Sequence, residues 1–474
     1  MSLLWTSQAL VAAMSGRPVG SMPQGVTGIS IDSRTLQPGD AFFAIKGEKF
    51  DGHDFATAAM KAGASLLVVE DSRLPALGRL AIPMIVVQDV LAALEMAGIA
   101  ARARSKARII AVTGSAGKTT TKEMLRTALS AVGRVHASDR SFNNHWGVPL
   151  TLARMPAESD YAIFEIGMNH PGEITNLVRQ VRPHIAIVTM IAAAHLGHFR
   201  NLDEIARAKA EIFSGVAKGG HALINRDDAR WKLLEKDARE AGVVNVWGFG
   251  QHARATFRLV RHEAAGDGVA ITARLAGEEI ELTLGAPGRH MVQNALATLG
   301  AAYLAGADMG KAAAALADVR AEKGRGRRHR LAHPDGVITL IDESYNANPA
   351  SMRAALDLLA ATPVEGEGRR IAVLGDMLEL GQHSARLHAG LADALDADLV
   401  FLGGPEMKAL AAKLDRAEHH ETAAAVAERL IATVRAGDAV MVKSSNGTGF
   451  ARVVDALLQK YPEIRDVETA AQAS

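Results

Sequence analysis

Short apolar runs alternate with longer amphipathic stretches along the chain. A short apolar run between polar turns predicts a buried strand, whereas apolar residues three and four positions apart predict a helix that buries one face. Strands and helices that alternate in this way predict an α/β fold. Strands are expected at 28–31, 41–45, 66–69, 84–87, 109–112, 161–165, 185–188, 222–224, 337–341, 371–374, 399–402 and 439–442, and helices at 7–14 (capped by Ser7), 54–62, 203–213 and 291–304, among others.

These elements fall into three units. The length of 474 residues suits about three domains of ordinary size. We expect a small α/β unit at 1–107, a central doubly wound parallel sheet at 108–320, and a second doubly wound, Rossmann-like sheet at 321–474. The third unit opens with the basic stretch 322–330, for which two interpretations stay open: a solvated linker, or arginines that neutralise phosphate charge.

The central unit opens with a glycine turn between a predicted strand and a predicted helix. Backbone N–H groups of such a turn, backed by the positive end of the helix, form a cradle for phosphate, as in P-loop ATPases. The usual loop has a glycine six residues before its lysine, where this chain has Val112, so the loop is a shortened form. A chance Gly-Lys-Thr at a helix start is the alternative, and the strand and helix on either side argue against it. The expected nucleotide-binding residues are Gly114, Ser115, Ala116, Gly117, Lys118, Thr119 and Thr120.

Within this loop, Lys118 is expected to reach the terminal phosphates, and the Thr119 hydroxyl is expected to hold Mg²⁺. Glu165 ends a neighbouring predicted strand, a position from which an acidic residue commonly helps to hold the metal in phosphate-loop enzymes. An exposed edge residue is the other interpretation. His195 could bind a metal or be structural. Lys209 lies on a partly apolar helix face, where it would either extend to water or be buried with a lowered pKa.

Polar clusters also stand at other turns and strand ends. Those at 32–34 and 47–53 are, by default, solvated turns. In the third unit, the loops 342–349, 375–377 and 443–447 follow predicted strands, and ligands of doubly wound sheets bind in such crevices. The segment 225–228 is a candidate for a ribose or base contact for the same reason.

Composition narrows the classes of protein. The chain has 53 Lys and Arg against 52 Asp and Glu, a balance that argues against a dedicated nucleic-acid or membrane-surface protein. It has no cysteine, which excludes disulfides and thiolate chemistry. Polar residues interrupt positions 1–10, which makes a poor signal peptide, and no apolar run is long enough to cross a bilayer. We expect a soluble, cytoplasmic protein.

Several long motifs in order resemble the Mur ligases, the amide-forming enzymes of peptidoglycan precursor synthesis. The resemblance covers essentially the whole chain and explains the shortened phosphate loop. The motifs are the phosphate loop 113–119, Ser141–Phe142–Asn143–Asn144 with Gly147–Val148–Pro149–Leu150, the segment 342–349 with its Ser–Tyr–Asn–Ala–Asn–Pro sequence, and Gly375–Asp376–Met377–Leu378–Glu379–Leu380–Gly381.

The resemblance implies a role for individual residues. In the ATP site, Asn294 would contact adenine, Arg327 or Arg325 would reach the phosphates from the third unit, and Asp342 would stand at the nucleotide edge. Glu165, His195 and a carbamylated Lys209 would join Thr119 as Mg²⁺ ligands. Lys118, His195, Lys209, Arg327 and Asp342 are the expected catalytic residues. The residues expected to bind the other substrates are Ser33, Arg34, Asp51, His53, Asn143, Asn144, Tyr345, Asn346 and Asn348.

The implied reaction uses ATP and Mg²⁺ to join D-alanyl-D-alanine to a UDP-muramoyl-tripeptide through an acyl phosphate. The unit 1–107 would bind the UDP-sugar, 108–320 would bind ATP, and 321–474 would bind the incoming dipeptide and close over the other two. Small molecules are the expected partners of a monomer, with neither nucleic acid nor membrane insertion. The alternatives are another Mur ligase step, a folylpolyglutamate synthetase-like ligase, a P-loop GTPase switch and an inactive scaffold.

Overall fold

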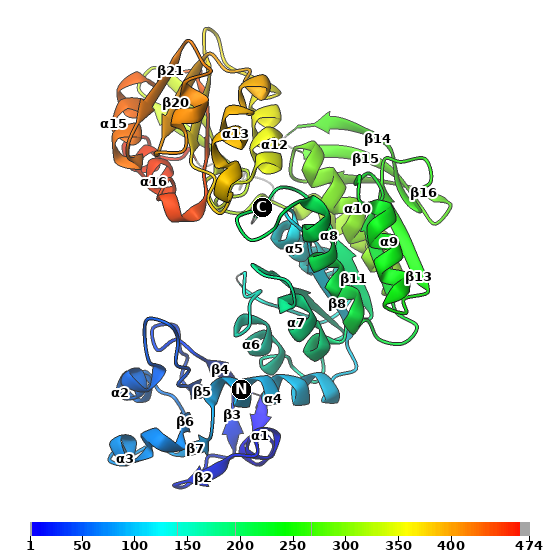
Figure 1. Cartoon of the computed structure of the whole chain (residues 1–474), viewed down its shortest axis with the longest axis vertical. Coiled ribbons are helices and arrows are strands. Elements are labelled where there is room, and N and C mark those ends of the chain that lie inside the picture. The colour runs from blue at the N-terminus through cyan, green and yellow to red at the C-terminus, as the bar shows by residue number, and fades with distance from the viewer. Residues whose placement is uncertain (1, 140, 195, 267, 465–474) are drawn as a thin grey trace, which may run out of the picture.

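A computed structural model describes residues 2–139, 141–194, 196–266 and 268–464. The chain forms three α/β bodies arranged as a crescent (Figure 1). The N-terminal body lies at one end of the crescent, the central body occupies its middle, and the third body lies at the other end. Each expected boundary, at 107/108 and at 320/321, falls between two of the sheets.

The first body is built on a five-stranded sheet. In spatial order its strands are β2 (Arg17–Val19), β7 (Met84–Val87), β6 (Leu66–Glu70), β5 (Asp40–Phe43) and β4 (Gly28–Ser30). A two-stranded ribbon of β1 (Trp5–Thr6) and β3 (Gly25–Val26) lies beside it, with helices α1 (Ser7–Met14), α2 (Ala56–Lys61), α3 (Leu74–Leu77) and α4 (Val90–Arg104).

The start of α1 differs from the expected one. Thr6, rather than Ser7, is the N-cap, and its hydroxyl accepts a hydrogen bond from Ala9 N at 3.2 Å. The Ser7 hydroxyl instead donates to Pro23 O at 2.6 Å. The cap therefore moves by one residue because Ser7 is used to hold the turn before β3.

The central body contains a nine-stranded sheet. Its order is β16 (Glu278–Leu284), β15 (Gly268–Leu275), β14 (Phe257–Ala265), β13 (Asn245–Gly250), β12 (His221–Asn225), β11 (Ile185–Val188), β8 (Arg108–Thr113), β10 (Tyr161–Glu165) and β9 (Val135–Ala137). The pairs from β9 to β14 are parallel, and β14 to β16 form an antiparallel meander.

Alternate residues of β8 belong to two different cores. Ile110 and Val112 pack with α5 (Lys118–Ser130) and α10 (Arg289–Leu304), with α11 (Met309–Ala314) nearby. Ile109 and Ala111 pack with α6 (Gly147–Ala153), α7 (Glu173–Val181), α8 (Leu202–Ala210) and α9 (Trp231–Glu240). Because successive side chains of a strand point to opposite faces, this pattern buries the sheet between two helical layers.

The third body has a six-stranded sheet in the order β17 (Arg327–His333), β18 (Gly336–Glu343), β22 (Ala439–Lys443), β19 (Arg370–Gly375), β20 (Leu399–Gly403) and β21 (Ala417–His420). Only the β17–β18 pair is antiparallel in this sheet as described. Its helices include α12 (Pro349–Ala360), α13 (Ser384–Ala389), α14 (Lys408–Ala411), α15 (Ala423–Thr433) and α16 (Ala451–Lys460).

Part of the basic stretch 322–330 is a strand, so the solvated-linker interpretation is wrong from Arg327 onward. His329 and Leu331 are buried, whereas Arg330 between them is exposed. The strand thus has period-two alternation, but its outward positions are arginines, which hid the pattern.

The first and third bodies attach differently to the central one. Helix α4 of the first body packs against α6, and Trp5 Nε1 donates to Ala153 O at 2.9 Å. The third body reaches the phosphate loop, where Asn348 Nδ2 donates to Ser115 O at 3.3 Å. A separate backbone contact joins the same two bodies, because Gly197 N of the central body donates to Glu379 O of the third at 2.8 Å. No helix among the described residues combines the length and apolar character that a bilayer span requires.

Candidate active site

The phosphate loop joins β8 to α5 and has a shape that requires glycine. Gly117 is the N-cap of α5 with φ +83°, and a Cβ there would lie 2.6 Å from Asn294 Oδ1. A Cβ at Gly114 would collide with Thr189 Oγ1. Since no side chain caps α5, the first amides of this helix are available to an anion.

A neighbouring loop holds the phosphate loop from behind. Ser115 N donates to Met190 O at 2.8 Å, and the Ser115 hydroxyl donates to Ala192 O at 3.0 Å. That loop is held in turn by Asn225 Nδ2, which donates to Thr189 O at 2.9 Å, and by Asp228 Oδ2, which accepts from Ile191 N at 2.6 Å. The segment 225–228, considered above for a ribose contact, therefore braces the loop.

Lys118 folds back over the loop, and its Nζ donates to Gly114 O at 2.9 Å. Burial lowers the pKa of this ammonium, the negative charge of Glu165 opposes that shift, and the positive charge of Arg325 adds to it. Arg325, a residue of the third body, thus acts on the phosphate-loop lysine through its charge.

The carboxylate of Glu165 accepts hydrogen bonds from three neighbouring side chains. Its carboxylate, on a side chain only 2% exposed, accepts from Thr119 Oγ1 at 2.9 Å, Ser141 Oγ at 2.9 Å and Asn143 Nδ2 at 2.7 Å. The edge-residue interpretation of Glu165 is thus wrong, and three predicted residues (Thr119, Asn143 and Glu165) lie together. Ser141 was not expected among the binding residues, although the polar loop before α6 was a recognisable signal.

These oxygens fit a hard cation. Magnesium ion is bound by a carboxylate or two, with water and phosphate oxygens completing its shell, and Glu165 with Thr119 offers a carboxylate and a hydroxyl. Among the described residues no group of three His, Cys, Asp or Glu is placed to hold a metal. His195, the other expected ligand, lies outside the described residues.

Lys209 lies on α8 and is 1% exposed, so its side chain does not extend to water. Burial lowers its pKa well below the usual value, and the charge of Lys118 lowers it further. In the ranges that the structure covers, Lys209 Nζ has no hydrogen bond or ion pair. A buried amine with a depressed pKa is a nucleophile at neutral pH.

Asn294, on α10, is 7% exposed, and its side chain lies against Gly117. This contact places a polar amide directly behind the start of α5. The expected contact of Asn294 with adenine is not tested by this arrangement.

The two candidate arginines diverge. Arg325 lies with its guanidinium carbon 4.0 Å from the centroid of the Tyr345 ring, and its charge acts on Lys118. Arg327 is half-exposed on β17, and its guanidinium lies 3.9 Å from the carboxylate of Glu463. Arg325 lies in the turn before β17, Gly326 bends the chain, and Arg327 begins the strand. The alternation of a strand therefore does not relate the directions of the two arginines, and the sequence alone could not tell which of them faces the phosphates.

Asp342 is fully buried, and its carboxylate is committed to internal hydrogen bonds. It accepts from Gly324 N at 2.8 Å, Ser344 N at 3.1 Å and Ser344 Oγ at 2.6 Å. These bonds fix the turn that carries Arg325. Asp342 was expected at the nucleotide edge, and what the structure adds is this role in holding the turn.

The loop after β18 has one buried and two exposed candidates. Tyr345 and Asn346 are exposed, whereas Asn348 is 5% exposed and caps α12. Lys443, which was not among the expected site residues, is 2% exposed, and its Nζ donates to Glu343 Oε2 and Asn346 O, both at 3.0 Å. Its position at the carboxyl end of β22 was the available signal.

The candidates of the first body lie apart from the phosphate loop. Arg34 pairs with Asp32 through two hydrogen bonds of 2.9 and 2.7 Å and is exposed, beside the half-buried Ser33. His53 Nε2 accepts from Glu70 N at 3.0 Å, so its Nδ1 donates to Asp51 Oδ1 at 2.6 Å. Both ring nitrogens of His53 are therefore used within the body.

Asn144 accepts a hydrogen bond from the first residue of a helix in the central body. Its Oδ1 accepts from Gly147 N at 3.0 Å at the start of α6, whereas Asn143 faces Glu165. The two adjacent asparagines thus make different contacts, Asn143 with Glu165 and Asn144 with the start of α6, although one role was expected for both.

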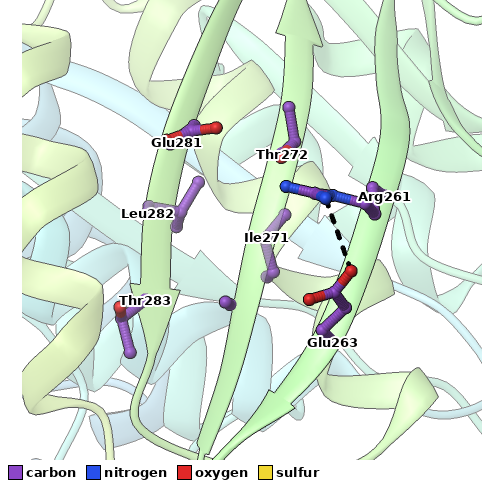
Figure 2. Close-up of a pocket in the computed structure, with 8 residues that line it drawn as sticks. Arg261, Glu263, Ile271, Thr272, Glu281, Leu282 and Thr283 are labelled. Atoms are coloured by element: carbon purple, nitrogen blue, oxygen red, sulfur yellow. Dashed lines mark ion pairs between the residues drawn. The ribbon is translucent and has the colours of Figure 1, made fainter.

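A separate hollow lies on the β14–β16 meander, where Arg261 and Glu263 form an ion pair of 3.4 Å (Figure 2). Strands β11, β12 and β13 separate β14 from β8 in the sheet order. This hollow therefore lies away from the phosphate loop and contains none of the expected site residues.

Three family models match consecutive parts of the chain: "Mur ligase family, catalytic domain" at 25–102, "Mur ligase middle domain" at 112–302, and "Mur ligase, glutamate ligase domain" at 326–446. The phosphate loop, the Glu165 cluster and Lys209 fall within the second match, and Asp342 and Asn348 fall within the third.

Relatives with this organisation are known in several bacteria. The UDP-N-acetylmuramoyl-tripeptide–D-alanyl-D-alanine ligase of Escherichia coli is 36% identical over 90% of this chain and 93% of its own. A crystal structure of MurF from Acinetobacter baumannii superposes with a TM-score of 0.83 at 30% identity, covering 96% of this chain and 99% of that one. MurF ligase from Thermotoga maritima in complex with ADP shares the fold, with a TM-score of 0.76 at 24% identity, covering 91% and 97%. The chain belongs to the Mur ligase family.

Proposed function

We propose that the chain is the ATP-dependent ligase that adds D-alanyl-D-alanine to UDP-N-acetylmuramoyl-tripeptide during peptidoglycan precursor synthesis. The printed activity of the Escherichia coli relative, which aligns over nearly all of both chains, supports this function. One structural observation carries the chemistry: Lys118 and the Glu165 cluster lie at an uncapped helix start, where the charge of Arg325 also acts on Lys118.

The reaction proceeds in two balanced steps. The terminal carboxylate oxygen of the tripeptide attacks the γ-phosphorus of ATP, the bond from that phosphorus to the β-bridging oxygen breaks, and ADP leaves. The amine nitrogen of D-alanyl-D-alanine then attacks the acyl carbon, a proton is lost, and phosphate leaves. Because two anions must approach in the first step, Lys118 and Arg325 are needed to neutralise charge. We assign the phosphate contact from the third body to Arg325 rather than Arg327.

Magnesium would be held by Thr119 and Glu165, with His195 and a carbamate on Lys209 as further ligands. When bound, the ion supplies charge neutralisation of the transferred phosphoryl group. Carbamylation converts the neutral amine of Lys209 into an anionic oxygen ligand, and its burial with a lowered pKa supports that change. Asn294 would contact adenine, and Asp342 would orient the nucleotide edge through the turn that it holds.

Each body would bind one reactant. The first body would hold the UDP-sugar near Ser33 and Arg34, with Asp51 and His53 shaping that surface from within. Asn143 and Asn144 would face the muramoyl-peptide, and the third body would present D-alanyl-D-alanine near Tyr345 and Asn346. We further propose a monomer that works in the cytoplasm, where nucleotide-linked substrates and ATP are available.

Phosphate release from ATP tests this proposal. Release is expected when UDP-muramoyl-tripeptide, D-alanyl-D-alanine and Mg²⁺ are all present, and not when either peptide substrate is omitted. Release with GTP in place of ATP and independent of the peptides would instead indicate a GTPase. No release under the complete conditions would overturn the proposed function.

A further inference from the structure

The amide of Asn348 crosses the boundary between the third body and the phosphate loop. Its Oδ1 accepts a hydrogen bond from Ser351 N at 2.9 Å and so caps α12. Its Nδ2 donates to Ser115 O at 3.3 Å. One buried side chain thus uses its oxygen within its own body and its nitrogen on the central body.

Ser115 is held from the opposite side. Its N–H and its hydroxyl are bonded to Met190 O and Ala192 O, which leaves its carbonyl directed at Asn348. This carbonyl lies within the segment whose backbone would cradle the phosphates. A change in the loop on phosphate binding therefore acts directly on the contact with the third body.

We propose that Asn348 is a positioning residue that couples occupation of the phosphate loop to the seating of the third body. This inference rests on the proposed function and adds to it. A ligand that binds one arrangement better shifts the molecule toward that arrangement, and the coupling is reciprocal. Arg325, whose charge acts on Lys118, belongs to the same body as Asn348, so seating of this body would bring its cation with it.

A second contact lies on the same boundary. Gly197 N donates to Glu379 O at 2.8 Å, and both groups are backbone. Of these two hydrogen bonds between the bodies, the one made by Asn348 depends on a side chain. That dependence makes the coupling accessible to substitution.

The chemistry of the amide allows its two tasks to be separated. Aspartate and serine are both good helix N-caps, so Asn348→Asp and Asn348→Ser keep the cap of α12. Aspartate replaces the donor by an anion that faces a carbonyl and the expected phosphates. Serine removes the donor without adding charge, because its side chain is too short to reach Ser115.

The experiment measures kcat and KM for ATP, with both peptide substrates present, for the full-length wild type and both variants. It also measures the radius of gyration by small-angle scattering with and without a non-hydrolysable ATP analogue. We expect kcat/KM for ATP to fall roughly 3- to 10-fold in Asn348→Ser and roughly 10- to 100-fold in Asn348→Asp. The compaction that the analogue causes in the wild type should shrink in both, with thermal midpoints close to that of the wild type.

Asn245→Asp is the matched control. Asn245 Nδ2 donates to Gly219 O at 3.1 Å and Gly220 O at 3.3 Å at the start of β13, at the amino ends of the parallel strands, whereas the phosphate loop lies at the carboxyl end of β8. The same chemical change there should leave the ATP parameters and the scattering response unaltered.

Three outcomes would overturn the coupling. Wild-type kinetics and compaction in both Asn348 variants would do so, as would lost activity with an unchanged scattering response, which would assign Asn348 to a substrate contact. A wild type that turns over ATP but does not compact would also do so. A wild type that fails to turn over ATP would instead contradict the proposed function.

Discussion

The first and third bodies are attached to the central body by different chemistry. The first shares an apolar core with it, since Leu150 and Ala153 of α6 are buried in the same cluster as residues of α1 and α4. The third meets it through the polar contacts of Asn348 and Gly197, and through the partly buried Leu387 of α13, which packs against a core of the central body. Apolar packing has no alternative partner in water, whereas polar contacts can be exchanged for water at small cost. We therefore expect the first body to stay fixed and the third, whose attachment is more polar, to move during the reaction.

The largest expected effect is a loss of ATP chemistry that leaves substrate binding by the first body unchanged. Lys118→Ala should reduce phosphate release by about a thousand-fold or more, because it removes a charge from the transition state. Binding of the UDP-sugar substrate, measured by calorimetry, should stay close to that of the wild type. Lys311→Ala, at an exposed lysine of α11, is the control and should retain activity. Loss of UDP-sugar binding in Lys118→Ala would show that the two bodies do not act separately.

The second prediction concerns the packing of Trp5 between the first body and the central body. Trp5 is 3% exposed, and the guanidinium carbon of Arg104 lies 3.6 Å from its ring centroid. Trp5→Ala should lower the free energy of unfolding by about 3 kcal/mol or more, seen as an early transition in urea. Trp5→Phe keeps most of the packing and loses the bond to Ala153 O, so about 1 kcal/mol is expected. Equal losses in the two variants would contradict an apolar attachment.

The third prediction tests which arginine of the third body contacts the phosphates of ATP. Arg325→Ala should lower kcat roughly 10- to 100-fold, since it removes the cation whose charge acts on Lys118. Arg327→Ala, at a half-exposed position near Glu463, should change kcat by less than about two-fold. The reverse order, measured by steady-state phosphate release, would place Arg327 at the phosphates.

The smallest expected effect concerns the pH dependence of stability. The pKa of Lys209 is depressed on folding, so the unfolded chain binds more protons than the folded one between the folded pKa and the usual value of 10.5. Stability therefore rises with pH across that interval, by at most about 1.4 kcal/mol per pH unit from this group. Lys209→Met, measured in magnesium- and bicarbonate-free buffer, should flatten the slope. An unchanged slope would show that Lys209 is charged in the folded state.

Much of the fold followed from pattern, because buried parallel strands such as β8, β10 and β11 are continuous apolar runs. Strand β17 was missed, since its outward positions are arginines and only its register against β18 reveals the alternation. The phosphate loop and Glu165 were predicted, because local spacing determines both. The hydrogen bond that Gly324 N donates to Asp342 was not, since it joins residues eighteen positions apart through a turn without a sequence signature.

In the present arrangement the ammonium of Lys118 donates a hydrogen bond to the carbonyl oxygen of Gly114. An incoming ligand must displace this oxygen before it gains the lysine's charge. A neutral nucleoside has nothing to exchange for it, whereas a polyphosphate tail offers several oxygens of higher charge. We therefore expect the loop to favour ligands that carry phosphate, because its own cation stays engaged until a stronger acceptor displaces the carbonyl oxygen.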